Sequence, residues 1–488
     1  MHGEKGLRRM TFEVEFRDLI DVGGLIARRV LTSVEVTEGL LERIQRIDGG
    51  LNAYACVLSD SALLQAETAD REIAEGIHRG PLHGVPIAVK DLCWVEGAPT
   101  AAGTVVHRDF VPTRDATVVR KLKEAGAVLI GKTQLTEGAY SDYHPSIPPV
   151  CNPWNREYWA GISSSGSAVA SAAGLCFGSI ASDTGGSIRW PSAANGVSGI
   201  KPTWGRVSRY GAFELAPSLD HLGPIARSVV DVAAMLKVIA GHDEDDPTTS
   251  LRPVDDFLAD TCANVRGKRI GVDRRWNSED VNPEIQTALA KACRVFSGLG
   301  VELVEVSFPD VQQIVADWTP NCAVEAAVAH QASYPVHRKQ YGPVLSSVIE
   351  AGMVISGIEY QKILLRRAVF RRDVETLLLC VDAVLTPIHP FAPLTLKTIA
   401  TLGEQPELIA KLQRYTCPFD MSGHPTLAFP GGYSTEGLPI GLQLVSASFD
   451  ESTLFSLGAA FQSVTDWHRR HPDLGGNEAG FCVAETKR

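Results

Sequence analysis

The chain has 488 residues, of which 44% are hydrophobic and 21% charged, and its formal net charge is −11. A chain of this length and hydrophobic content can build a large core, which excludes disordered, collagen-like and coiled-coil proteins as classes. The acidic balance, without a block of Lys and Arg, argues against nucleic acid as a partner.

The cysteines and the N-terminal sequence indicate a reducing compartment. The chain has 10 cysteines but no C-x-x-C pair, and the two nearest in sequence, Cys151 and Cys176, lie far apart. No charged region followed by an apolar one opens the chain, and its longest uncharged stretch is rich in Ser, Gly and Ala. We therefore expect a cytoplasmic protein that has no membrane as partner.

The first 75 residues have a helical pattern. Thr32 and Glu35 have the spacing of a capping box, and apolar residues then follow on one helical face. From Leu82 the period changes, and residues 85–89 (VPIAV) are predicted to form a short buried strand that leads into Lys90. The strand therefore ends at a lysine.

The next segments alternate between helix and strand. Asp115 is predicted to cap a helix that Gly126 ends, and residues 127–130 read as a strand. A helix over 283–297 followed by a strand over 301–306 repeats this order, which is typical of an α/β layer fold. Two further strands are predicted over 381–386 and 440–445.

A Gly/Ser-rich segment lies between these units. Residues 158–182 carry no charged side chain, and residues 183–189 (DTGGSIR) follow an apolar run and precede a short predicted helix. A serine at such a strand-to-helix turn has free backbone N–H groups beside it, as an oxyanion site requires. A flexible linker is disfavoured by the apolar residues within the segment. A phosphate-binding loop is disfavoured because neither of its glycine motifs occurs at such a junction.

A nucleophilic serine needs a base. The chain has no G-x-S-x-G motif and no convincing Ser, Asp, His order. A lysine can serve if burial keeps it neutral, and Lys90 stands at the end of an apolar strand. The alternative is an ordinary lysine whose side chain reaches water at the strand end.

At this point the sequence resembles a known family. The motifs GVPIAVKDL around Lys90, GISSSGS at 161–167 and DTGGSIRWPSAANGVSGIKPTWGRVSRYG from 183 closely resemble the amidase signature family. The similarity runs from about residue 20 to 474. It implies an α/β fold, the amidase signature fold, with a large mixed β-sheet sandwiched by α-helices.

The resemblance also implies a domain division. We expect a leader over 1–20 that is disordered, a single amidase domain over 21–474 and a tail over 475–488. The expected parts of the domain are a helical arm over 21–75, the signature core over 76–240, a helix-rich cap over about 245–380 and a return to the core over 381–474.

The resemblance assigns roles to individual residues. Ser187 would be the nucleophile, Ser163 the bridging serine and Lys90 the base. The backbone N–H groups that would form the oxyanion hole are those of Thr184, Gly185, Gly186 and Ser187. Asp183 and Arg189 would support the turn without taking part in the chemistry.

One position departs from the family pattern. Ile162 stands where the family usually has glycine before the bridging serine, and we still expect the Ile162–Ser163 peptide bond to be cis. Ile162 is also expected to contact substrate, together with Tyr140, Tyr143 and His144, which match the loop that borders the acyl pocket in the family. For each of these aromatic side chains taken singly, packing is favoured over contact with substrate.

The resulting hypothesis is an amidohydrolase that cleaves the C–N bond of small carboxylic amides by a Ser–cisSer–Lys mechanism. Aryl and aliphatic acyl amides are expected as substrates, and hydrazides and carbamates are left open. We expect no metal or organic cofactor. The expected assembly is a homodimer. The alternative is the A subunit of a glutamine-dependent tRNA amidotransferase, whose usual Gly/Ser-rich loop is replaced here by residues 140–144. A non-catalytic homologue is disfavoured by the intact lysine and serines.

Overall fold

The computed structural model describes residues 14–474. The expected tail over 475–488 and the first thirteen residues of the expected leader lie outside the described residues. The rest of that leader packs on the domain: Leu19 is fully buried and its N–H donates to the Asp231 carboxylate at 3.0 Å.

A mixed sheet of 11 strands forms the centre of the described chain, in the order β1-β3-β2-β4-β6-β5-β10-β11-β9-β7-β8. The pairs β2–β3, β2–β4, β7–β8 and β7–β9 are parallel, and the others are antiparallel. The strands are β1 (Tyr54–Val57), β2 (Pro86–Lys90), β3 (Val128–Thr133), β4 (Gly178–Asp183), β5 (Ser198–Lys201), β6 (His221–Ala226), β7 (Arg269–Val272), β8 (Glu302–Glu305), β9 (Ala383–Pro387), β10 (Thr426–Tyr433) and β11 (Pro439–Ser446).

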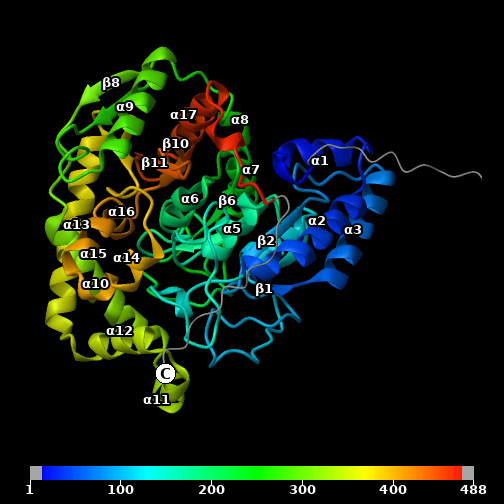
Figure 1. Ribbon diagram of the computed structural model, residues 1–488, viewed down its shortest axis with the longest axis horizontal. Coiled ribbons are helices and arrows are strands. Elements are labelled where there is room, and N and C mark those ends of the chain that lie inside the picture. Colours follow the sequence, from blue (N-terminus) through cyan, green and yellow to red (C-terminus); the bar gives the residue numbers. More distant parts are fainter. Residues whose placement is uncertain (1–13, 475–488) are drawn as a thin grey trace, which may run out of the picture.

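Helices cover the sheet and one side of the molecule (Figure 1). They are α1 (Leu19–Ala27), α2 (Ser33–Ile47), α3 (Ser59–Ala74), α4 (Thr117–Glu124), α5 (Ser165–Ala172), α6 (Arg189–Asn195), α7 (Val229–Ile239), α8 (Phe257–Asp260), α9 (Pro283–Gly298), α10 (Gln312–Ala329), α11 (Tyr334–His337), α12 (Pro343–Val354), α13 (Gly357–Leu378), α14 (Leu396–Ala400), α15 (Pro406–Gln413), α16 (Cys417–Ser422) and α17 (Glu451–Ser463). Within the described residues, none is long and apolar enough to span a membrane.

Neighbouring residues of β10 show that helices pack on both faces of the sheet. Leu427 lies against Gly458 of α17, whereas Ala428 clusters with Ala193 of α6. Successive side chains of a strand point to opposite faces, so α17 and α6 lie on opposite sides of β10. The expected large mixed sheet between α-helices is confirmed.

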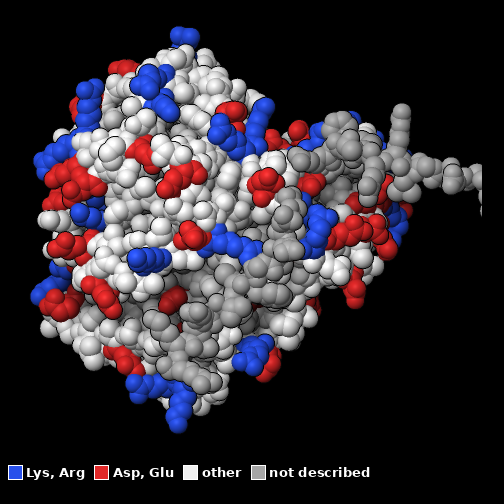
Figure 2. Space-filling model, viewed as in Figure 1, with Lys and Arg blue, Asp and Glu red and all other residues white. Residues whose placement is uncertain are grey.

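The segment over about 245–380, which was expected to form a helix-rich cap, divides into two parts. Its first part adds β7, α9 and β8 to the edge of the sheet, through the pairing of β7 with β9. Its second part, α10 to α13, gathers on the side of the molecule opposite α1–α3 (Figure 1). On the face shown in Figure 2, acidic and basic side chains are interspersed, without a continuous block of either sign.

Two local predictions had different outcomes. The capping box is confirmed, because the Thr32 side chain accepts from the Glu35 N–H and Glu35 bonds back to the Thr32 backbone. The prediction that Asp115 caps a helix is wrong: α4 has Ala116 at its N-cap position. The Asp115 carboxylate instead accepts from the Glu96 N–H at 2.8 Å and pairs with Lys123 at 2.7 Å.

Candidate active site

The candidate site is built on the turn between β4 and α6. All six residues of β4 are buried, and the strand ends at Asp183. The chain turns over residues 184–188, where Gly186 has a φ of 138° that favours glycine, and α6 then ends at a left-handed Gly196. The predicted strand, turn and short helix are therefore present.

The Asp183 carboxylate organises this turn. It accepts hydrogen bonds from the N–H groups of Gly186 at 2.6 Å and Ile188 at 2.9 Å. Its two oxygens also face the Arg189 guanidinium, at 3.0 Å from Nε and 2.9 Å from Nη2. Burial opposes ionisation, but Arg189 and these amides hold the pKa of Asp183 below its usual range.

The amides of the turn fall into two groups. The Gly186 N–H, expected in the oxyanion hole, is already bonded to Asp183. In the described structure, the N–H groups of Thr184, Gly185 and Ser187 make no hydrogen bond to the protein. These three amides therefore remain available to an oxyanion, and Gly186 is the exception among the four expected donors.

Lys90 ends β2 as a fully buried lysine. Its Nζ lies 2.7 Å from Ser163 Oγ, 2.8 Å from Ser164 Oγ and 2.8 Å from Ser182 Oγ. Burial lowers the pKa of Lys90 to about 7, against a small opposing influence of nearby acidic groups. The side chain does not reach water, so the strand-end alternative does not describe it.

The serine cluster brings Ser163 and Ser187 onto adjacent backbone segments. The Ile162–Ser163 peptide bond is cis, as expected, and the Ser164 N–H donates to the Ser187 carbonyl at 3.3 Å. Ser187 is 7% exposed, the one member of the three expected catalytic residues that is not fully buried. The described structure shows no hydrogen bond between the hydroxyls of Ser163 and Ser187.

The four residues expected to contact substrate have different surroundings. Ile162 belongs to an apolar cluster with Trp159 and Trp190, and Tyr140 packs against the cap. Tyr143 Oη bonds to Ser165 Oγ at 2.5 Å, so its hydroxyl already has a partner. His144 is partly exposed, and its Nδ1 lies 2.7 Å from Ser146 Oγ.

Sequence reasoning missed several groups that hold the turn. Asp220 accepts from Thr184 Oγ1 at 2.7 Å, and Cys417 Sγ lies 3.4 Å from the Gly185 carbonyl oxygen. Trp318 donates its Nε1–H to the Thr184 carbonyl at 2.8 Å. None of these positions has a local pattern that would have singled it out, because each acts through a contact distant in sequence. Among residues 14–474, no group of three or more His, Cys, Asp or Glu side chains could hold a metal ion.

Comparisons with known proteins place this chain among amidases. A family model described as amidase matches residues 35–455. The chain is 49% identical over 458 residues to a putative amidase, AmiD, of Mycobacterium tuberculosis, covering 94% of this chain and 96% of that protein. It is 37% identical to the A subunit of the glutamyl-tRNA(Gln) amidotransferase of Moorella thermoacetica, over 93% and 98% of the two chains. A bacterial aryl acylamidase of the amidase signature family has a similar structure, with a TM-score of 0.83, 28% identity and coverage of 93% and 98%.

Proposed function

Because the chain belongs to the amidase signature family, and is therefore a hydrolase of amide C–N bonds, we propose that it cleaves small carboxylic amides through an acyl-enzyme on Ser187. The observation that carries the proposal is the surroundings of Lys90, a fully buried amine within 2.8 Å of three serine hydroxyls. A lysine in this state is a base at neutral pH.

The proton relay follows from the hydrogen-bonding capacity of these groups. A neutral Lys90 amine can donate two N–H bonds, to Ser164 and Ser182, and accept one from the Ser163 hydroxyl. Ser164 can only accept from the Lys90 amine, because its own hydroxyl proton is donated to the Ser182 carbonyl at 3.0 Å. Between the two remaining hydroxyls, the family resemblance assigns Ser163, and not Ser182, as the one from which Lys90 takes the proton.

The chemical steps balance over this relay. Lys90 accepts the proton of Ser163, Ser163 accepts that of Ser187, and Ser187 Oγ forms a bond to the amide carbonyl carbon. The amides of Thr184, Gly185 and Ser187 stabilise the resulting oxyanion. The proton returns through the relay to the leaving nitrogen as the C–N bond breaks, and water then cleaves the acyl-enzyme by the same route. The first step requires a hydrogen bond from the Ser187 hydroxyl to Ser163 Oγ.

The lining of the site supports an apolar acyl group. Ile162 precedes the bridging serine and packs with Trp159 and Trp190, and Trp318 lies against Gly185. We propose aryl and aliphatic acyl amides as the first substrates to test, with hydrazides and carbamates beside them. The proposed homodimer, which rests on the family resemblance, is tested by light scattering of the purified chain.

The test is amine release from a panel of primary amides, anilides, hydrazides and aryl carbamates. The wild type is expected to hydrolyse at least one class, and Ser187→Ala to lose that turnover. Ser171→Ala is the matched control, because it removes a buried hydroxyl that, among the described residues, bonds only to the Ser167 carbonyl and to Cys176. Near-normal turnover by Ser187→Ala would refute the assignment of the nucleophile.

The subunit of a tRNA amidotransferase is the second candidate, supported by 37% identity to such a subunit, lower than the 49% to the putative amidase. The two roles differ in whether a partner is needed. Hydrolysis of a simple amide by the purified chain alone would exclude an obligate subunit, whereas activity that appears only with partner subunits would favour it.

A further inference from the structure

Behind the turn lies a second buried lysine that the relay does not use. Lys201 ends β5 and is fully buried. Its Nζ lies 2.6 Å from the His424 carbonyl oxygen, 3.2 Å from the Pro202 carbonyl oxygen and 3.2 Å from His221 Nε2. Three acceptors match the three N–H groups of an ammonium, which is the form that these contacts favour.

His221 connects this lysine to the turn. Its Nδ1 lies 2.6 Å from the Leu219 carbonyl oxygen, which can only accept, so Nδ1 carries the proton and Nε2 accepts from Lys201. Burial and the neighbouring Lys201 charge lower the pKa of His221 well below its usual value, which keeps the ring neutral. In the sheet His221 is paired directly with Asp183.

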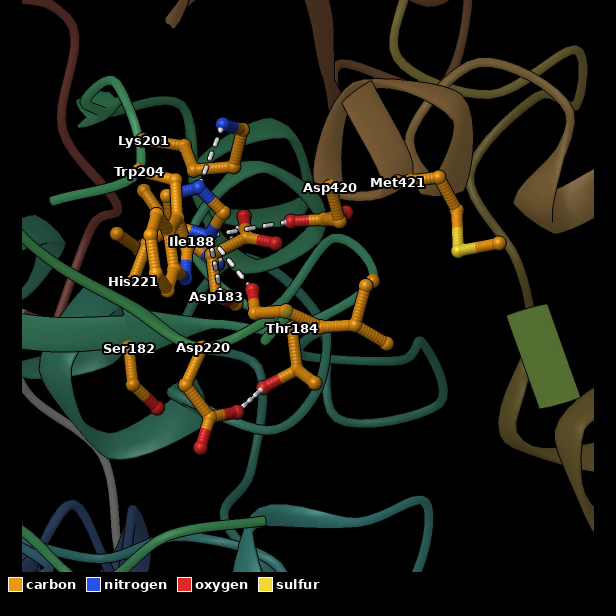
Figure 3. A network of polar contacts seen from close by, with 12 residues as sticks. Ser182, Asp183, Thr184, Ile188, Lys201, Trp204, Asp220, His221, Asp420 and Met421 are labelled. Atoms are coloured by element: carbon orange, nitrogen blue, oxygen red, sulfur yellow. Dashed lines mark hydrogen bonds and ion pairs between the residues drawn. The ribbon is translucent and has the colours of Figure 1, made fainter. Parts of the chain in front are cut away.

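Asp420 approaches the same group from α16. Its Oδ2 accepts from Arg189 Nη2 at 2.6 Å, while its Oδ1 lies 3.7 Å from His221 Nδ1 and has no hydrogen bond in the described structure. Arg189 is therefore held between two carboxylates, Asp183 and Asp420. Figure 3 shows Lys201, His221, Asp183 and Asp420 close together in one network of polar contacts.

The four ionisable side chains balance in charge. Asp183, Arg189, Lys201 and Asp420 are all fully buried, and a buried ion without a counter-ion costs several kcal/mol. Asp183 matches Arg189. Asp420 and Lys201 balance each other either as an ion pair or as two neutral groups, because burial raises the pKa of Asp420 well above its usual value. Burial lowers the pKa of Lys201 to about 7, and Asp420 opposes this shift.

The short helix α16 also holds the turn directly. Besides the contact of Asp420 with Arg189, the Thr416 carbonyl before the helix accepts from Arg189 Nη1 at 2.9 Å. At the start of the helix, Cys417 lies against the Gly185 carbonyl. The orientation of Arg189, and through it of the Asp183 carboxylate, thus depends on where α16 is fixed.

We propose that Lys201 and Asp420 are positioning residues for acylation, which fix Arg189 and Asp183 and thereby aim Ser187 and the free amides of the turn. This inference rests on the proposed function, since it assumes that Ser187 is the nucleophile. Neither residue touches the substrate. Their effect is on the placement of the reacting atoms, and a displacement of about 1 Å can lower a rate about 100-fold.

The test compares Asp420→Ala, Asp420→Asn and Lys201→Met with the wild type. We measure kcat and KM on an amide that the wild type hydrolyses, the rate of Ser187 labelling by a fluorophosphonate, and Tm. Asp420→Ala and Lys201→Met should lower kcat and the labelling rate about 10- to 100-fold with little change in KM. Asp420→Asn keeps an acceptor for Arg189 and should retain more activity than the alanine variant.

Asp243→Ala is the matched control, because it removes a buried carboxylate that accepts from Thr117 and Ser208 and touches none of the four charged groups. It should leave kcat within about threefold at a comparable loss of Tm. Unchanged kcat in Asp420→Ala and Lys201→Met, or an equal fall in Asp243→Ala, would overturn the proposal. Failure of the proposed function is distinguished by the wild type, which would then show no labelling of Ser187.

Discussion

The protonation state of Lys90 gives the sharpest prediction. Since only the neutral amine can accept a proton from Ser163, activity should follow the neutral fraction of Lys90 and rise with pH. Burial places the pKa of this lysine at about 7, whereas an ordinary lysine has a pKa of about 10.4. At pH 7 about half of the molecules would hold the neutral amine, against about one in 2500 for an unperturbed lysine.

The expected change of activity with pH can be stated as a fold-change. With a pKa of about 7, the neutral fraction rises about tenfold between pH 6 and pH 8 and then levels off. The value of kcat/KM should follow this curve with a limiting slope of one, and so should the labelling of Ser187 by a fluorophosphonate. Agreement between the two assays would assign the ionisation to the activation of Ser187 as a nucleophile, because labelling involves no leaving amine.

Two variants complete the test. Lys90→Met keeps the length of the side chain but cannot bind a proton, and Lys90→Arg keeps its proton at every accessible pH. Both should lose about 10²- to 10⁴-fold in kcat/KM, and the rise of kcat/KM with pH near pH 7 should disappear. A flat wild-type profile from pH 6 to 9, or a midpoint near 10, would refute the reasoning.

The remaining predictions concern the turn and the cap. A Cβ added to Gly185 would lie 2.5 Å from the Trp318 ring, so Gly185→Ala should lower kcat about 10- to 100-fold, whereas Gly39→Ala, where nothing lies within 4 Å, should not. Equal kcat in both variants would contradict this close packing. Burial raises the pKa of Glu137 to about 7, so stability from its carboxyl is present below pH ~4.3 and lost as the pH rises through 7. Glu137→Gln keeps an acceptor for the Gly342 N–H. It should raise the free energy of unfolding by up to about 3 kcal/mol at pH 8 but little at pH 4.5. Denaturant unfolding at both pH values measures this difference, and an equal gain at the two would count against the prediction.

Much of the local structure could be predicted from the sequence, because its causes are local. The capping box of α2 needs only Thr32 and Glu35, and β2 follows from a run of apolar residues that ends at Lys90. The turn after β4 is similarly encoded by its glycines. Asp115 shows the limit of such reasoning, since a partner from another loop, the Glu96 N–H, occupies the carboxylate that the pattern assigned to a helix end.

The sequence by itself thus determined the residue types of the site and the order of its elements. Only the tertiary structure decided which groups meet: the parallel pairing of β2 with β4 places the Lys90 amine beside Ser182, and Lys201 and Asp420 reach the turn from β5 and α16. The physical reason is that backbone preferences act over a few residues, whereas buried charges find their partners through the order of strands in the sheet.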